Sequence, residues 1–233
     1  CFVTVRARPQ SFGTNFRVRY SKVDEATDAF GIDHPAVRQL LQNFQIDYPL
    51  DLNHSSDMPA RSGIGSSSAF LAATYAGLSP ESIDRLSPYE LSNELSEIER
   101  GQLEETCGLQ DSIFAVFGGF NLVEFTSAGF LVHQSIASRT YLRTLASHCF
   151  LIYLGNDRLS SAQQQGLLED MPRSSTVLNE LAQMARETFG EINREILEPW
   201  NLGARVSEGW ELKKRSSPNA TTEDVNALHE ELE

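Results

Sequence analysis

Apolar and polar residues alternate near the start of the chain, which predicts β-structure there. The alternation runs through residues 2–8 and again through 16–20, with Gly13 between the two runs. A period of two is typical of a strand with one face toward a core. We therefore expect a strand, a turn and a strand, followed by a short strand at 50–53.

Three later segments have the period of a helix. Residues 35–45 place apolar side chains at helical spacing behind Asp33, which we expect to cap this helix. The run 69–78, "AFLAATYAGL", is apolar on nearly every side and predicts a buried helix. Ser87, Pro88 and Glu90 fit a capping box, so a third helix is expected to begin at Pro88.

The remainder of the chain mixes a few strands with helices. "FNLVEF" and "FLVHQSI" flank Ala128 and Gly129 and predict a hairpin, "HCFLIYLG" predicts a buried strand, and the C-terminal third is mainly helical. Strands and helices do not alternate as in a parallel doubly wound sheet. We therefore expect an α+β fold with two lobes, at residues 1–147 and 148–233.

Composition excludes several classes of protein. A formal charge of −13 over 233 residues argues against a nucleic-acid binder, which needs a basic surface. Apolar runs are too short to cross a bilayer, so no membrane partner is expected. The three cysteines lack metal-like spacing, which favours reduced thiols in a cytoplasmic protein, and the five histidines form no spaced cluster.

Residues 59–70, "PARSGIGSSSAF", form a loop suited to phosphate. Gly63 and Gly65 permit positive φ and close approach of a ligand to the backbone. The following helix presents unpaired N–H groups that attract anions. The alternative is a Gly/Ser turn whose serines cap the helix, and taken alone this loop fits that interpretation better. The loop matches neither the P-loop nor the dinucleotide fingerprint.

Two carboxylates follow at places that suit phosphoryl transfer. On a helical wheel of about 100° per residue, Glu99 lies at the edge of the apolar stripe and Glu97 points away from it. Asp111 follows shortly before a second apolar run. Each alone is more often a solvated residue or a helix cap, but the loop and both carboxylates together favour a kinase.

The loop resembles the Pro-x-x-x-Gly-Leu-Gly-Ser-Ser-Ala-Ala motif of the GHMP kinases. The resemblance implies a two-lobed fold, with a first lobe like ribosomal protein S5 that binds ATP and a ferredoxin-like second lobe. It implies ATP binding by Pro59, Arg61, Gly63, Ile64, Gly65, Ser66, Ser67 and Ser68. It further implies Mg²⁺ binding by Ser67 and Glu99, with Asp111 as the catalytic base.

The segments "IERGQLEETCGLQDSIFAVFGGFNLVEF", "LIYLGNDRLSS" and "GWELKKRSS" resemble the branch of sugar 1-kinases that includes the heptose 7-phosphate kinases and the L-fucokinases. This implies transfer to the anomeric hydroxyl of a sugar phosphate, with D-glycero-D-manno-heptose 7-phosphate as the leading substrate. Candidate substrate contacts are Asp111, Gly118, Gly119, Arg158 and Lys213. Alternatives are a kinase of another sugar such as L-fucose, a catalytically weakened nucleotide-binding relative, and a structural module. The sequence leaves the oligomeric state open, with a homo-oligomer as one option.

The chain departs from the pattern of this branch in two respects. Ser112 stands where the branch usually has glutamine, which affects the acceptor pocket. The chain begins at Cys1 without a methionine, and the Gly-rich segments of the family would precede Cys1 and follow Glu233. We therefore expect a longer parent protein, and weak activity or none from residues 1–233 alone.

Overall fold

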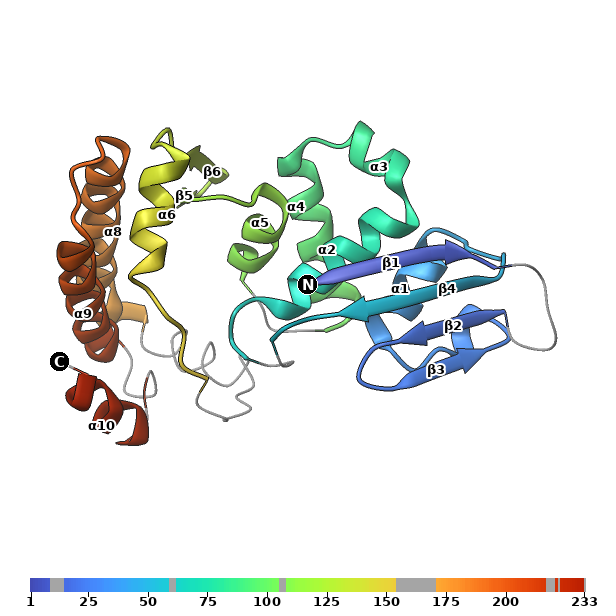
Figure 1. Cartoon of the computed structure of the whole chain (residues 1–233). Helices are drawn as coiled ribbons and strands as arrows, with labels where there is room; N and C mark the ends of the chain where they lie inside the picture. The colour runs from blue at the N-terminus through green and yellow to red at the C-terminus, as the bar shows by residue number, and fades with distance from the viewer. Residues whose placement is uncertain are drawn as a thin grey trace. The chain divides into compact units, whose positions relative to one another are not determined.

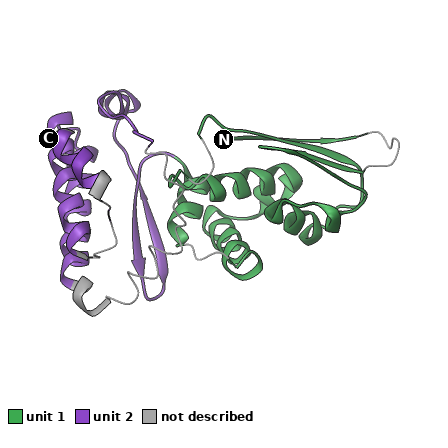
Figure 2. Cartoon of the chain, turned by 90° about the horizontal axis from the view of Figure 1, so that it is seen from below, with its two compact units in different colours: residues 1–118, 155–158 green, residues 119–154, 159–233 purple. Residues whose placement is uncertain are grey.

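The computed structural model describes residues 1–8, 15–58, 62–104, 108–153, 171–216, 221 and 223–232, which form two compact units (Figures 1 and 2). The described part of unit 1 is Cys1–Gly118, and unit 2 begins at Gly119. This division falls earlier than the boundary predicted near Ser147. In unit 2 the rings of Phe120 and Phe189 stack at 6.3 Å, which ties the hairpin region to the C-terminal helices.

Unit 1 contains a four-stranded sheet with the order β1-β4-β2-β3 (Figure 1). Its strands are β1 (Phe2–Ala7), β2 (Phe16–Arg19), β3 (Val23–Ala26) and β4 (Leu50–Ser55). β4 is antiparallel to β1 and parallel to β2, whereas β2 and β3 are antiparallel. The predicted strands at 2–8, 16–20 and 50–53 are confirmed. However, the first two are not paired with each other, because β4 lies between them.

The helices of unit 1 gather on one face of this sheet (Figure 2). They are η1 (Ala29–Gly31), α1 (Pro35–Asn43), α2 (Ser66–Leu78), α3 (Pro80–Arg85), α4 (Pro88–Glu97), the turn η2 (Ile98–Gln102) and α5 (Leu109–Phe117). Leu50 and Leu52 of β4 are fully buried against Leu40 and Leu41 of α1 and Leu71 of α2 in one apolar core. Strand alternation places Asp51 on the opposite face.

Two helix starts test the predicted caps. The capping box of α4 is confirmed, because Ser87 and Glu90 bond each other's backbone N–H groups. The cap predicted for α1 is wrong: the N-cap is His34, and Asp33 pairs with Lys22 at 2.9 Å. The carboxylate of Asp24 on β3 accepts hydrogen bonds from the backbone N–H groups of Asp33 and His34, at 2.7 and 3.2 Å. A tertiary contact therefore replaces the local cap.

Unit 2 combines a hairpin with helices, as the sequence predicts. Its elements are β5 (Asn121–Thr126), β6 (Gly129–Gln134), α6 (Arg139–Ser147), α8 (Met171–Asn193), α9 (Pro199–Ser216) and α10 (Glu223–Leu232). β5 and β6 are antiparallel, which confirms the hairpin. The α+β class is confirmed, while the ferredoxin-like arrangement of the second lobe stays a prediction. In the part of the chain that the structure describes, no helix is long and apolar enough to cross a membrane.

The buried strand predicted from "HCFLIYLG" is wrong for its described residues. Residues 148–153 form no strand, and the side chains of Phe150 and Leu151 are 76% and 78% exposed. An apolar run with strand-like composition becomes a buried strand only when a neighbouring strand and a packed face receive it. Among the described residues of unit 2, the hairpin strands pair only with each other.

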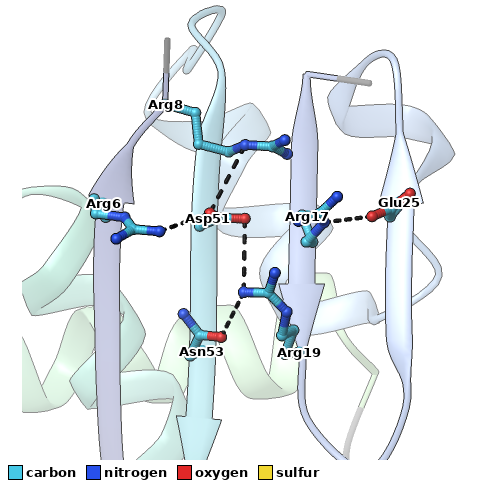
Figure 3. Close-up of polar contacts among 7 residues, drawn as sticks. All are labelled: Arg6, Arg8, Arg17, Arg19, Glu25, Asp51 and Asn53. Atoms are coloured by element: carbon cyan, nitrogen blue, oxygen red, sulfur yellow. Dashed lines mark hydrogen bonds and ion pairs between the residues drawn. The ribbon is translucent and has the colours of Figure 1, made fainter. Parts of the chain in front are cut away.

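Arginines surround the buried carboxylate of Asp51 on the sheet face opposite the helices (Figure 3). Asp51 is only 4% exposed, and its carboxylate lies 3.2 Å from Arg6 Nη2, 3.7 Å from Arg8 Nε and 3.8 Å from Arg19 Nη1. Beside this cluster, Arg17 pairs with Glu25 on the neighbouring strand. Because Asp51 is the shared partner of three guanidinium groups, it offsets their mutual repulsion.

Asp51→Asn should destabilise the protein by about 1–3 kcal/mol, because three arginines would then face a neutral amide. This range is below that for a fully buried pair, since water screens the exposed guanidinium of Arg6. Urea unfolding at pH 7 measures the change. Asp33→Asn, which breaks the exposed pair with Lys22, is the control and should hardly move the midpoint. Equal effects of the two substitutions would contradict a central role of Asp51.

Candidate functional site

The Gly-rich loop leads directly into α2, and its backbone requires glycine at two positions. Gly63 has φ +75° and Gly65 has φ +70°, a conformation that residues with a Cβ rarely adopt. Gly65 is the N-cap of α2 and makes no side-chain capping bond. The alternative in which the serines of this turn cap the helix does not hold for Ser66 or Ser68, since α2 begins at Ser66. The first N–H groups of α2 are left without an N-cap side chain, as an anion site requires.

The three serines of this turn lie in different environments. Ser67 is exposed, Ser66 is partly buried, and Ser68 is 2% exposed. Ile64, on the loop, is 47% exposed. Pro59 and Arg61, which the resemblance assigns to ATP binding, lie outside the described residues.

Glu99 is buried, although the helical wheel predicts it at the edge of the apolar stripe. α4 ends at Glu97, and a wider π-helical turn follows, in which the N–H of Leu103 donates to the carbonyl of Ile98 at 2.9 Å. This turn changes the angle between successive side chains, so the ideal wheel no longer applies. Glu99 is consequently 1% exposed, whereas Glu97 is exposed as predicted.

Two serine hydroxyls bind the Glu99 carboxylate. Ser68 Oγ of α2 donates to Oε1 at 2.6 Å, and Ser112 Oγ of α5 donates to Oε2 at 2.8 Å. Both serines are buried, Ser112 completely. Ser68, expected to cap the helix or touch phosphate, instead uses its hydroxyl on Glu99. Two features of the sequence point to these serines: Ser68 aligns with an alanine of the motif, and Ser112 replaces a glutamine.

Asp111 lies in the first turn of α5, against the phosphate loop. A Cβ placed on Gly65 would lie only 3.2 Å from Asp111 Cγ and 3.5 Å from Oδ1. A glycine is therefore needed at position 65 both for its φ and for the space that Asp111 occupies. Partial burial raises the pKa of the Asp111 carboxyl above its ordinary value. A carboxylate with a raised pKa beside an anion site is suited to proton transfer.

The remaining predicted substrate residues belong to different parts of the chain. Gly118 and Gly119 end α5 with φ values of +58° and +73°, which explains both glycines by backbone conformation. Lys213 is an exposed residue of α9 in unit 2, whereas the loop, Glu99 and Asp111 all belong to unit 1. Arg158 lies outside the described residues.

The donor set of the site suits Mg²⁺. This ion prefers oxygen ligands and is usually held by one or two protein groups together with substrate phosphates. Glu99 supplies a carboxylate and Ser67 supplies an exposed hydroxyl, and both are oxygen ligands. Within the described ranges, no group of three or more His, Cys, Asp or Glu residues could hold a metal.

Two cavities lie away from the loop. One, of about 360 Å³, lies within unit 2 between β5, α8 and α9, and is lined by residues such as Leu122, Met184 and Val206. The other, of about 380 Å³, lies in unit 1 beside Asn93, Ser96 and Arg100. The candidate site thus rests on the side-chain geometry around Gly65, and not on a closed cavity.

Residues 32–119, which contain the loop, Glu99 and Asp111, match the GHMP kinases N terminal domain. This match confirms, over these residues, the resemblance predicted from the loop motif. Over 74 residues the chain is 38% identical to D-glycero-alpha-D-manno-heptose 7-phosphate kinase of Campylobacter jejuni subsp. jejuni serotype O:2. This match covers 32% of the chain and 22% of that relative.

Two solved structures share the fold. A D-glycero-D-manno-heptose 1-phosphate kinase from Bacteroides thetaiotaomicron matches with a TM-score of 0.63 and 19% identity, over 91% of this chain and 67% of that one. A putative sugar kinase from Campylobacter jejuni matches with a TM-score of 0.51 and 20% identity, over 88% of this chain and 65% of that one. At these identities the likeness shows the fold alone, and it agrees with the α+β class predicted from the sequence.

Gly65→Ala should lower the pKa of Asp111 toward its ordinary value, because the added methyl group would displace the carboxyl from the loop into water. Gly63→Ala is the matched control: it has the same strained φ, but its Cβ would meet no atom within 4 Å. NMR titration of the aspartate carboxyl carbons measures both. The same Asp111 pKa in the two variants would argue against the contact with Gly65.

Proposed function

We propose that this chain is the core of an ATP- and Mg²⁺-dependent sugar kinase that phosphorylates the anomeric hydroxyl of a sugar phosphate. The observation that carries the proposal is the Asp111 carboxyl against Gly65, directly in front of the first turn of α2. An anion-binding helix start and a carboxylate with a raised pKa thus lie side by side. Phosphoryl transfer to a hydroxyl needs both groups.

The reaction would be a direct in-line transfer. Asp111 accepts the proton of the anomeric hydroxyl while the sugar oxygen bonds to the γ-phosphorus of ATP. The bond from that phosphorus to the β–γ bridging oxygen breaks, and ADP leaves. The N–H groups after Gly65 stabilise the phosphate oxygens, whose charge is spread in the transition state. Ile64 and Ser66, which the resemblance also assigns to ATP binding, would contact the nucleotide at the same place.

Ser67 and Glu99 would hold Mg²⁺, which when bound neutralises charge on the phosphate oxygens. Ser67 is exposed in the first turn of α2, and the next residue, Ser68, bonds Glu99. Removing the Ser67 hydroxyl should therefore affect magnesium-dependent turnover more than folding, since its side chain is not part of the core.

The proposed substrate is D-glycero-D-manno-heptose 7-phosphate, and the product its 1,7-bisphosphate. Support comes from the curated relative, named as a heptose 7-phosphate kinase, which shares 38% identity over the matched segment. Arg158 and Lys213 are proposed to assist with the substrate phosphate, because fixed cations suit it. Gly118 and Gly119 would let the backbone approach the sugar. A kinase of L-fucose remains the alternative substrate assignment.

Asp111→Asn should lower kcat by about 10²–10⁴-fold while ATP still binds, because the amide cannot accept the proton. In the wild type, kcat should rise as pH rises through the Asp111 pKa, and this acidic limb should lie above 3.8. Steady-state rates across pH and ATP calorimetry measure both effects. Glu97→Gln changes an exposed carboxylate and should behave as wild type. Near-normal turnover by Asp111→Asn would remove Asp111 from the role of base.

The sugar should be identified by ATP consumption of the full-length protein with a panel of sugars, with and without a phosphate group. We expect turnover with the heptose 7-phosphate and a new anomeric phosphate signal in ³¹P NMR. Turnover with L-fucose instead would favour the alternative substrate. ATP binding without turnover of any sugar would indicate the catalytically weakened relative, and absence of ATP binding a structural module.

A further inference from the structure

We propose that Ser68 and Ser112 are positioning residues that orient Glu99 between them, and thereby set the arrangement of the phosphate loop relative to Asp111. This inference rests on the proposed function, because Glu99 matters to catalysis only if the site transfers phosphate. The family resemblance assigns Ser68 to ATP binding and Ser112 to no role, and it does not imply that either serine holds Glu99.

The three residues connect the three elements that carry the site. Ser68 is in the first turn of α2, directly behind the Gly-rich loop, and Ser112 follows Asp111 in the first turn of α5. Glu99 lies on the π-helical turn between α4 and α5. Its Oε1 accepts from Ser68 at 2.6 Å and its Oε2 from Ser112 at 2.8 Å. One carboxylate therefore bonds both helices.

All three side chains are almost completely excluded from solvent. Ser68, Glu99 and Ser112 are 2%, 1% and 0% exposed, so a lost hydroxyl is not readily replaced by water. A buried carboxylate oxygen without its donor is destabilised, and the side chain is expected to rotate toward another donor. Rotation would move Glu99 from the orientation in which it could reach a metal. The outer partners of a metal ligand act in this way.

The two hydroxyls also act on different oxygens, which fixes the plane of the carboxylate as well as its position. Ser68 stands where the motif has alanine, and Ser112 where the branch usually has glutamine. Two serines that are distant in sequence thus bond one carboxylate.

The experiment compares threonine and valine at each position. Ser112→Thr and Ser112→Val add the same methyl group, but only threonine keeps the hydroxyl, and Ser68→Thr and Ser68→Val do the same in α2. Ser92→Ala is the control for a buried serine elsewhere, because Ser92 is 0% exposed and donates to the Pro88 carbonyl at 2.8 Å. Mn²⁺ binding in the presence of ADP, followed by EPR, gives a readout that does not require turnover.

Each valine variant should bind Mn²⁺ about 10- to 100-fold more weakly than its threonine partner, with a similar loss of kcat and little change in KM for ATP. The Ser68→Val/Ser112→Val double variant should lose less than the product of the single effects, since both act through Glu99. Ser92→Ala should match wild type in Mn²⁺ affinity.

Equal Mn²⁺ affinity of the threonine and valine variants would overturn the inference. So would a loss in Ser92→Ala as large as in the valine variants, because the effect would then be one of general stability. A wild-type full-length protein that binds Mn²⁺·ADP but phosphorylates no sugar would overturn the proposed function, while the threonine–valine comparison would still decide the inference. A wild type that binds no Mn²⁺·ADP would overturn both.

Discussion

The buried carboxylate of Glu99 is the interaction around which the candidate site is arranged. It joins the starts of α2 and α5 through Ser68 and Ser112, so the Gly-rich loop and Asp111 have a common reference point. The contact between Gly65 and Asp111 follows from this arrangement, because the two helices meet there. Because the Glu99 carboxylate and its two serine donors are buried, water does not readily replace the donors. The hydrogen bonds therefore hold the three side chains in one arrangement.

Local sequence patterns predict the structure correctly where neighbouring residues alone determine the backbone conformation. The capping box of α4 needs only Ser87 and Glu90, and the positive φ of Gly63 and Gly65 needs only residues without a Cβ. The GHMP resemblance, drawn from one loop and two carboxylates, placed those residues in the domain that residues 32–119 match. Loop, Glu99 and Asp111 were thus predictable as a set.

Predictions failed where a distant partner decides the outcome. Asp33 has the composition of a cap, but Asp24 on β3 bonds the backbone at the start of α1 instead. Glu99 was predicted at the edge of a regular helix, and the π-helical turn buries it. The roles of Ser68 and Ser112 could not be predicted, because a short polar side chain gives no periodic signal and its partner lies on another element.

The arginines around Asp51 have a consequence for how β1 finds its place. β1 and β4 are far apart in the sequence, and Arg6 pairs with Asp51 when Val5 faces Leu52. A slip of β1 by one residue would turn its arginines toward the apolar core and its valines toward water, and Asp51 would lose two of its cationic neighbours. The arginines and Asp51 therefore favour the native alignment of β1 with β4 over a slipped one.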